Sequence, residues 1–344
     1  MHKPSIAVYG ATGHTGQFVV RELQGRGYPV VGVGRNPPPP SDEERPDAVG
    51  EWRIAACDDP DALDEALRGN HAVINCAGPF LDTAPALIEA SLRAGVHYFD
   101  VTAEQRSVRQ SLATYDAEAR ERGVVVLPAM AFFGGLADLL AADVVSRIGP
   151  ADSVEIGVAL DYWHPTQGTR LTGDRNTARR LVVADGRLLP IPRPTPTRAW
   201  TFPEPFGEQT VTAVTLSEIV TINRHIAARN VCSFMNLAPL RDINDPGTPP
   251  PTTSDTWGRS SQRFVMDVHA ASAGGRCRIT ASGLDIYAIT APIVVEGCQR
   301  VLEGPSVTGG TYAPAELFDA DSFLAALAPH LSVTRSLDKD PSVN

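Results

Sequence analysis

The chain has 344 residues, of which 43% are hydrophobic and 20% charged, a composition typical of a globular protein rather than a disordered or fibrous one. Its length favours two domains over one compact core. A formal net charge of −10 argues against nucleic acid or an acidic membrane as a general partner, although it is compatible with a local basic pocket.

Cysteine and lysine usage narrows the chemistry further. The five cysteines are scattered, odd in number and without a CxxC pair, which is typical of reduced thiols in a cytosol and gives no metal signature. Among the 30 basic residues only Lys3 and Lys339 are lysines, so the body of the fold has no amine for Schiff-base chemistry or a Tyr-x-x-x-Lys dyad. We expect a cytoplasmic protein without a metal centre.

The first part of the chain alternates short apolar runs with helical stretches, several of which end in Gly after a basic residue. Such repeated units with continuous apolar strands predict a Rossmann-type, doubly wound parallel sheet covered on both faces. The expected strands are 6–10, 29–34, 52–56, 72–78, 97–101 and 124–128.

A glycine-rich loop follows the first expected strand. Gly10, Gly13 and Gly16 form GxxGxxG between this strand and a helix, which predicts a tight turn, room for a pyrophosphate and close helix packing. Thr12, His14 and Thr15 would add donors where the helix dipole favours an anion. A dinucleotide site is the interpretation, and a purely structural glycine turn is the alternative.

The end of the second strand indicates which dinucleotide binds. Arg35 and Asn36 stand where an acidic residue would grip a ribose 2′-OH, and a guanidinium suits a 2′-phosphate. NADP(H) is therefore favoured, unless Arg35 is only a solvated surface residue. Asp58, after the third strand, would meet the adenine amino group or else cap the following helix.

A second candidate segment follows the fourth strand. "NCAGPF", 75–80, places small residues where the backbone would lie along the ribose and nicotinamide of the cofactor. From it we take five expected cofactor-binding residues, which are Cys76, Ala77, Gly78, Pro79 and Phe80.

The stretch 124–145 is apolar enough to resemble a membrane span. Pro128, Gly134, Gly135 and two aspartates interrupt it, which favours a strand, a turn and a helix, and no membrane span.

Beyond residue 150 the sequence pattern changes: apolar and polar residues partly alternate with period 2, and prolines cluster. This predicts a second α+β domain on a mostly antiparallel sheet, with a hairpin near 261–290 and an exposed connection at 241–258. The expected division is a dinucleotide domain at 1–134, a substrate and dimerisation domain at 135–290, C-terminal helices at 291–330 returning toward the first domain, and a polar tail at 331–344.

Taken together, these segments resemble the saccharopine dehydrogenase-like NAD(P)-binding family, particularly its branch with the trans-acting enoyl reductases. The resemblance is carried by "GATGHTGQ", "GRN", "NCAGPF", "AGVHYFDVTAE" and "LPAMAFFGGLADLLA", and by later segments such as "PTQGTRLT". It implies a Rossmann domain, an inserted α+β domain, terminal helices that return, and a homodimer.

Two departures from the family pattern affect these expectations. The loop is GxxGxxG rather than the GxGxxG of lysine-pathway saccharopine reductases, which argues against saccharopine as the substrate. "VTAE" stands where relatives often have Gly before the Glu, so the surroundings of Glu104 are expected to differ.

The segment "DYWHPTQGTRLTGDR", 161–175, offers the first catalytic candidates. His164 would give or take a proton and Tyr162 would donate a hydrogen bond, whereas the alternative is aromatic packing before a turn. Asp100 and Glu104, after the fifth strand, are the other candidates, with Asp100 expected rather to cap the following turn.

Four arginines, Arg170, Arg175, Arg179 and Arg180, lie in one helix-like stretch, where they bind an anionic substrate tail or form a solvated basic face. His225 and His269 are expected to be structural.

The sequence thus predicts an NADP(H)-dependent oxidoreductase. Its substrate would be a small molecule, anionic or carrier-linked and bearing a carboxylate or phosphate, in which a C=N or activated C=C bond is reduced by hydride transfer. The alternative is a non-catalytic NADP(H) sensor with the same fold.

Overall fold

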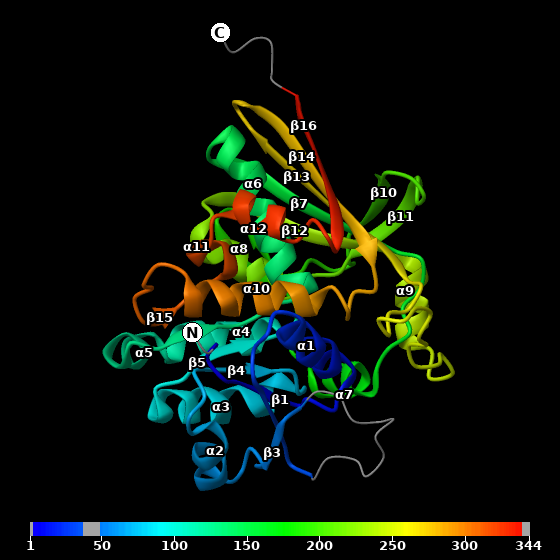
Figure 1. Ribbon diagram of the computed structural model, residues 1–344. Coiled ribbons are helices and arrows are strands. Elements are labelled where there is room, and N and C mark those ends of the chain that lie inside the picture. Colours follow the sequence, from blue (N-terminus) through cyan, green and yellow to red (C-terminus); the bar gives the residue numbers. More distant parts are fainter. Residues whose placement is uncertain (1–2, 37–48, 339–344) are drawn as a thin grey trace.

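The computed structural model describes residues 3–36 and 49–338, and it builds them around two β-sheets. In Figure 1 the two sheets lie one above the other, and helix α10 (Thr290–Glu303) runs between them. The lower sheet holds the N-terminal half of the chain and the upper sheet most of the rest.

The first sheet is parallel, with the order β15-β6-β5-β4-β1-β2-β3. Six of its strands are the predicted ones with bounds that differ by a few residues, and all but the edge strand β3 are mostly buried on both faces. These strands are β1 (Ile6–Tyr9), β2 (Val30–Gly34), β3 (Glu51–Ile54), β4 (Ala72–Asn75), β5 (His97–Asp100) and β6 (Val125–Leu127).

Helices connect β1 to β2 and each strand from β3 to β6 to the next, as the sequence predicts. Gly95 and Gly123 each follow a helix with φ near +67, the left-handed conformation that glycine adopts without strain. The helices are α1 (His14–Gly25), α2 (Pro60–Leu67), α3 (Phe80–Ala94), α4 (Gln105–Thr114) and α5 (Asp116–Arg122).

The second sheet is mostly antiparallel, as expected, with the order β10-β11-β12-β7-β13-β14-β16 and a parallel pair, β12 with β7. Strands β8 and β9 form a side hairpin that pairs with β12. Its strands are β7 (Ala151–Leu160), β8 (Leu181–Ala184), β9 (Arg187–Pro190), β10 (Thr197–Thr201), β11 (Glu208–Ala213), β12 (Ala228–Asn236), β13 (Arg263–Ser272), β14 (Gly275–Leu284) and β16 (Leu331–Asp338).

The apolar stretch 124–145 becomes strand β6, a π-helical turn η1 (Phe132–Leu136) and helix α6 (Ala137–Ile148), as predicted. Among the residues that the structure describes, no helix has the length and apolar content needed to cross a membrane. The remaining helices are α7 (Gln167–Arg175), α8 (Glu218–His225), α9 (Leu237–Asn244), α11 (Pro314–Leu317) and α12 (Ala320–Ala326).

The C-terminal part departs from the expected division. Residues 331–338, expected as the start of a polar tail, form β16 and pair with β14 from Arg276 to Gly283. Alternate residues of this strand are polar because one face of an edge strand meets solvent. Composition alone therefore does not distinguish this strand from a polar tail. The rest of the expected tail, 339–344, lies outside the described residues.

Two other expectations are corrected in detail. The segment 208–222, part of the chain with partial period-2 alternation, divides into β11 and α8. The connection at 241–258 begins inside α9 rather than as irregular chain. In the C-terminal segment, α10 packs on α1, and β15 (Gly310–Thr311) joins the edge of the first sheet beside β6.

The third glycine of the loop sets how closely α1 approaches β1. A Cβ on Gly16 would lie 2.1 Å from the carbonyl oxygen of Gly10. Gly25, at the other end of the same helix, has nothing within 4 Å of such a Cβ. Gly16 and Gly25 can therefore serve as a test position and its control within one helix.

We predict that Gly16→Ala lowers the free energy of unfolding by about 2 kcal/mol or more, because backbone must move to admit the methyl group. Gly25→Ala in the same helix should raise it by about 0.5 kcal/mol, since alanine is the better helix former. Urea denaturation followed by circular dichroism measures both. Equal stability of the two variants would contradict this account of the helix contact.

Candidate active site

The glycine loop forms an open cradle at the start of α1. Gly10 leaves β1 with φ +81, where a Cβ would lie 2.9 Å from the Ala77 Cβ, and its carbonyl accepts from the Gly13 N–H at 2.9 Å. No side chain caps the helix at Gly13, so the first-turn N–H groups from His14 to Gly16 are available to an anion. These residues fit a dinucleotide pyrophosphate.

The side chains near the cradle divide into two groups. Thr12 is exposed, and Thr15 lines the cavity described below. The His14 ring instead packs edge-on against Phe18 and Tyr287, with both centroids 5.3 Å away. Burial lowers the pKa of His14, and its buried Nε2 has no hydrogen-bond partner. Only the backbone of His14 therefore fits its predicted role as an anion donor.

Three expected residues meet at the outer end of the sheet, where β2 and β3 finish. Arg35 and Asn36 are exposed directly after β2, and Asp58 is exposed after β3. Arg35 and Asp58 both act electrostatically on Tyr9, whose pKa is raised chiefly by burial. The helix-cap alternative for Asp58 is wrong, because the Asp59 carboxylate accepts from the Ala62 N–H at the start of α2.

A cavity of about 230 Å³, here called the main cavity, lies between the first sheet and α7. Thr15, Cys76, Gly78 and Phe80 line it, so the structure brings together parts of the glycine loop and of the segment 75–80. Ala77 and Pro79 are not among the lining residues. Other walls are apolar or carry hydroxyl groups and include Val101, Phe132, Phe133, Trp163, Thr166, Thr169, Thr172, Ile243, Ile286, Tyr287 and Thr290.

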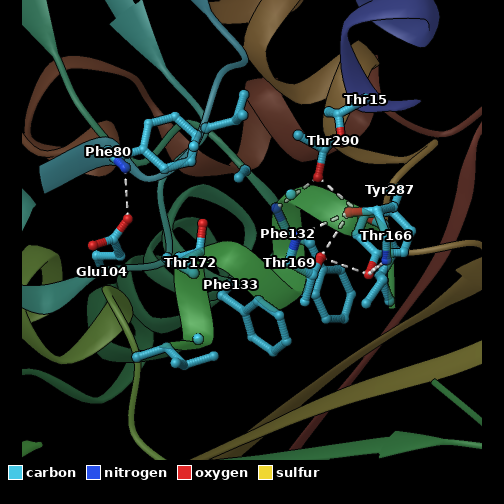
Figure 2. Close-up of a pocket in the computed structure, with 18 of the residues that line it drawn as sticks. Thr15, Phe80, Glu104, Phe132, Phe133, Thr166, Thr169, Thr172, Tyr287 and Thr290 are labelled. Atoms are coloured by element: carbon cyan, nitrogen blue, oxygen red, sulfur yellow. Dashed lines mark hydrogen bonds between the residues drawn. The ribbon is translucent and has the colours of Figure 1, made fainter. Parts of the chain in front are cut away.

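Glu104 is the acidic side chain that lines the main cavity, and it is 1% exposed. Its Oε1 accepts from the Phe80 N–H at 2.7 Å, at the start of α3, as Figure 2 shows. Its buried Oε2 has no partner. Burial is the main reason that the pKa of Glu104 is raised to about 7, so this carboxyl can hold or release a proton near neutral pH.

Asp100 holds the turn that carries Glu104. Its Oδ1 accepts from the N–H groups of Thr102 and Ala129, and its Oδ2 accepts from the Tyr98 hydroxyl. The Thr102 hydroxyl in turn accepts from the Glu104 N–H at 3.0 Å. Burial raises the pKa of Asp100 to about 6, but its oxygens are already used to shape the turn, as the sequence predicts.

The structure places the first catalytic candidates outside the main cavity. The Tyr162 hydroxyl pairs with Ser261 Oγ at 3.1 Å, and its ring lies against His164 with centroids 4.5 Å apart. Trp163, between them in sequence, lines the cavity and donates from Nε1 to the Tyr287 hydroxyl at 2.8 Å. This arrangement favours the packing alternative for Tyr162 and His164.

Sequence reasoning missed the hydroxyl cluster around Tyr287. Its hydroxyl lies 2.9 Å from Thr169 Oγ1 and 3.4 Å from the Thr166 N–H, and Figure 2 shows these groups on one wall of the cavity. Tyr287 follows the second strand of the β13–β14 hairpin, more than 100 residues from its partners. No local pattern signals a contact at that separation.

The four arginines of segment 170–180 do not form one helix face. Arg170 donates to the Thr248 carbonyl at 2.8 Å, and Arg175 pairs with Asp82 at 2.9 Å. Arg179 and Arg180 lie beyond the end of α7.

The two histidines expected to be structural each contact a carboxylate. His225 Nε2 lies 2.9 Å from Asp138 Oδ1, and His269 Nε2 lies 3.0 Å from Asp267 Oδ2.

The first part of this chain is similar to several known proteins. Residues 6–127 match the family model of the saccharopine dehydrogenase NADP binding domain. A saccharopine dehydrogenase-like oxidoreductase of Mus musculus is 28% identical over 157 residues, which span 39% of this chain and 35% of the mouse protein. A trans-acting enoyl reductase of Mycobacterium ulcerans is 28% identical over 139 residues, spanning 37% of this chain and 32% of that protein.

A solved structure extends the likeness to the whole fold. The apo histidine-tagged saccharopine dehydrogenase (L-Glu forming) of Saccharomyces cerevisiae matches with a TM-score of 0.65 at 13% identity, covering 97% of this chain and 100% of that one. The predicted family resemblance and fold class are therefore confirmed. The sequence relatives are matched over about a third of their own length.

We predict that Glu104 makes stability fall with rising pH. Its pKa is raised from 4.5 to about 7, so folding favours the protonated form, and the stabilisation present below pH 4.5 is lost as pH rises through 7. Glu104→Gln mimics the protonated form, so at pH 8 it should exceed the wild type by about 2 kcal/mol, with a smaller difference at pH 5. Denaturant titrations at both pH values measure this, and a pH-independent difference would refute it.

Proposed function

We propose that this chain, whose N-terminal domain is of the saccharopine dehydrogenase NADP binding type, is an NADP(H)-dependent oxidoreductase that reduces a C=N or activated C=C bond. The single observation that carries the proposal is the Glu104 carboxyl, which has a pKa of about 7, has a buried unpartnered oxygen, and belongs to a residue that lines a cavity adjoining the cofactor cradle. A hydride acceptor bound there would meet a proton donor.

The residues of the first domain hold the cofactor in this proposal. The first turn of α1 binds the pyrophosphate, Arg35 pairs with the 2′-phosphate, and the backbone at Cys76 and Gly78 lies beside the nicotinamide end. A Cβ on Gly78 would lie 2.6 Å from Thr172 Oγ1, so this strand end is closely approached from α7. When bound, the nicotinamide supplies the hydride.

Residues outside the cofactor cradle exclude water and orient the substrate. Phe132, Phe133 and Trp163 form an apolar wall, and the Tyr287 hydroxyl with Thr169 offers hydrogen bonds to a polar group. Glu104 delivers a proton from Oε2, while Oε1 stays fixed by the Phe80 N–H. Reducing a C=N or activated C=C bond needs only this one proton donor beside the hydride.

The non-catalytic sensor is the weaker alternative. Its support was the lack of an obvious catalytic dyad in the sequence, and the acid in the main cavity removes that support. The predicted homodimer and the cytoplasmic location stay predictions.

We predict that the wild type binds NADPH at least tenfold more tightly than NADH. Arg35→Ser should weaken NADPH binding about tenfold to a hundredfold, because one charge-assisted phosphate contact is lost, and should leave NADH binding unchanged. Nicotinamide fluorescence titration measures both affinities. Arg68→Ser, an exposed arginine at the end of α2, is the control. Equal losses for both cofactors would contradict the assignment of Arg35.

We predict that the protein oxidises NADPH in the presence of at least one substrate from a panel of cyclic imines and enoyl thioesters. The loss of reduced-nicotinamide absorbance measures this reaction. Glu104→Gln should lower kcat about a hundredfold with unchanged NADPH binding, since it removes the proton donor. The wild-type kcat/KM, which reports the free enzyme, should fall above pH 7, whereas the exposed control Glu121→Gln should behave as the wild type.

Three other outcomes decide against parts of this scheme. Tight NADPH binding without turnover across the panel would favour the sensor. Turnover that Glu104→Gln leaves intact would exclude Glu104 as the donor. Failure of well-folded protein to bind either cofactor would end the proposal.

A further inference from the structure

A second cavity, here called the basic pocket, opens beside the main cavity and has a volume of about 210 Å³. Its lining includes Arg106, Arg109, Arg179 and Arg180. Across residues 3–36 and 49–338, no carboxylate lies within ion-pair distance of any of these four guanidinium groups. Four such cations around one small cavity are unusual in a chain with a net charge of −10.

The fold holds the two pairs of arginines against each other. Arg106 and Arg109 are three residues apart on α4, so they share one helix face. Between α4 and the start of β8, the Gln105 side chain accepts from the Leu181 N–H at 2.7 Å and donates to the Leu181 carbonyl at 3.0 Å. This reciprocal pair fixes the first turn of α4 beside the segment that carries Arg179 and Arg180.

The arginines of the second pair are held by backbone rather than by acids. Arg179 donates to the Ile191 carbonyl at 2.9 Å, and Arg180 donates to the Thr215 carbonyl at 3.1 Å. The acid that acts electrostatically on Arg180 is Glu218, which is 2% exposed and accepts hydrogen bonds from the Leu216 N–H and the Ser233 hydroxyl. Among the described residues, none of the four guanidinium groups forms an ion pair, so the pocket carries an excess of positive charge.

The side chain of Thr215 gives a second, independent indication that a ligand binds in the basic pocket. It lines the basic pocket, is 0% exposed, and its hydroxyl has no hydrogen-bond partner. A buried hydroxyl without a partner is costly unless something that binds there completes it. An anion held by the arginines would accept that hydrogen bond.

The basic pocket and the main cavity share a wall. Ala103, Asn176, Arg180 and Leu216 line both, and Glu104 in the main cavity directly precedes Gln105 in the basic pocket. A ligand in one cavity therefore lies next to a ligand in the other. The main cavity is largely apolar, with Phe132, Phe133 and Trp163 among its lining residues, so the two together fit an elongated molecule with an apolar body and an anionic end.

We propose that the basic pocket binds the phosphate group of the substrate, whose reducible bond lies in the main cavity; this assignment rests on the proposed function. A phosphate monoester carries up to two negative charges and three oxygens that accept from planar guanidinium groups, which suits four arginines better than a single carboxylate does. The substrate class is thus a phosphorylated molecule with an apolar reactive part.

The test uses isothermal titration calorimetry with hexyl phosphate, hexanoate and inorganic phosphate, each run with and without saturating NADPH. We expect hexyl phosphate to bind at least tenfold more tightly than the other two, because it fills both cavities. The double variant Arg106→Ala/Arg109→Ala should weaken its binding about a hundredfold, since two charge-assisted contacts are lost. Arg187→Ala, an exposed arginine on β9, is the matched control and should bind as the wild type.

Each other outcome overturns the assignment. Hexanoate binding as tight as hexyl phosphate would make the substrate a carboxylate, and equally tight inorganic phosphate would make the pocket a site for free phosphate. Unchanged binding by the double variant, or no binding by the wild type at about 10 mM ligand, would remove the site altogether. Because NADPH binding is recorded separately, loss of the cofactor site and loss of the phosphate site are distinguishable.

Thr215→Val provides a second variant that keeps the shape of the side chain. A structural hydroxyl would cost stability when it is removed, whereas one that waits for a ligand would not. We therefore expect an unchanged or higher urea midpoint together with about fivefold weaker hexyl phosphate binding. A lower midpoint with unchanged ligand binding would show that the hydroxyl serves the fold.

Discussion

One continuous hydrophobic core joins the two sheets, and the geometry of the site depends on it. Ile6 and Val8 of the first sheet belong to the same buried cluster as Ile156 and Met266 of the second. Helices α1, α6 and α10 supply most of the side chains between them, and Figure 1 shows α10 along this boundary. A large apolar interface opposes relative domain motion, so the walls of the main cavity keep a fixed separation.

This fixed frame explains how Glu104 acquires its properties. The carboxyl comes from a turn after β5, which Asp100 shapes through Thr102, and one oxygen is held at the start of α3. The other oxygen is buried without a partner. Burial keeps a proton on Glu104 up to about neutral pH. The chain has no lysine between Lys3 and Lys339 that could act as a proton donor instead.

The features readable from the sequence are those that depend on neighbours along the chain. The strands of the first sheet are predicted from the hydrophobic period, the glycine spacing and the helix stops, because each of these signals lies within about ten residues of chain. The cradle of Gly10, Gly13 and Gly16 belongs to this class, as does the turn at Asp100. Arg35 was placed correctly at the end of β2, since strand and loop lengths decide its position.

The features that sequence reasoning missed come from pairing between distant segments. Strand β16 is polar at alternate positions and gains its order from β14, some 50 residues earlier. The hydroxyl of Tyr287 meets Thr169 only because the hairpin β13–β14 returns toward the first sheet. The basic pocket joins Arg106 on α4 to Arg180 through the contact between Gln105 and Leu181, a separation that carries no periodic signal.

In the proposed reaction, substrate binding and proton delivery are coupled by the same burial that sets the pKa of Glu104. Desolvation is the largest cause of its raised value, because water stabilises the charged carboxylate and an apolar environment does not. A ligand with an apolar body displaces the remaining water from the main cavity and so raises this pKa further. Under the proposed function, the acid is then protonated when the substrate is in place, and it returns toward its resting state when the product leaves and water re-enters.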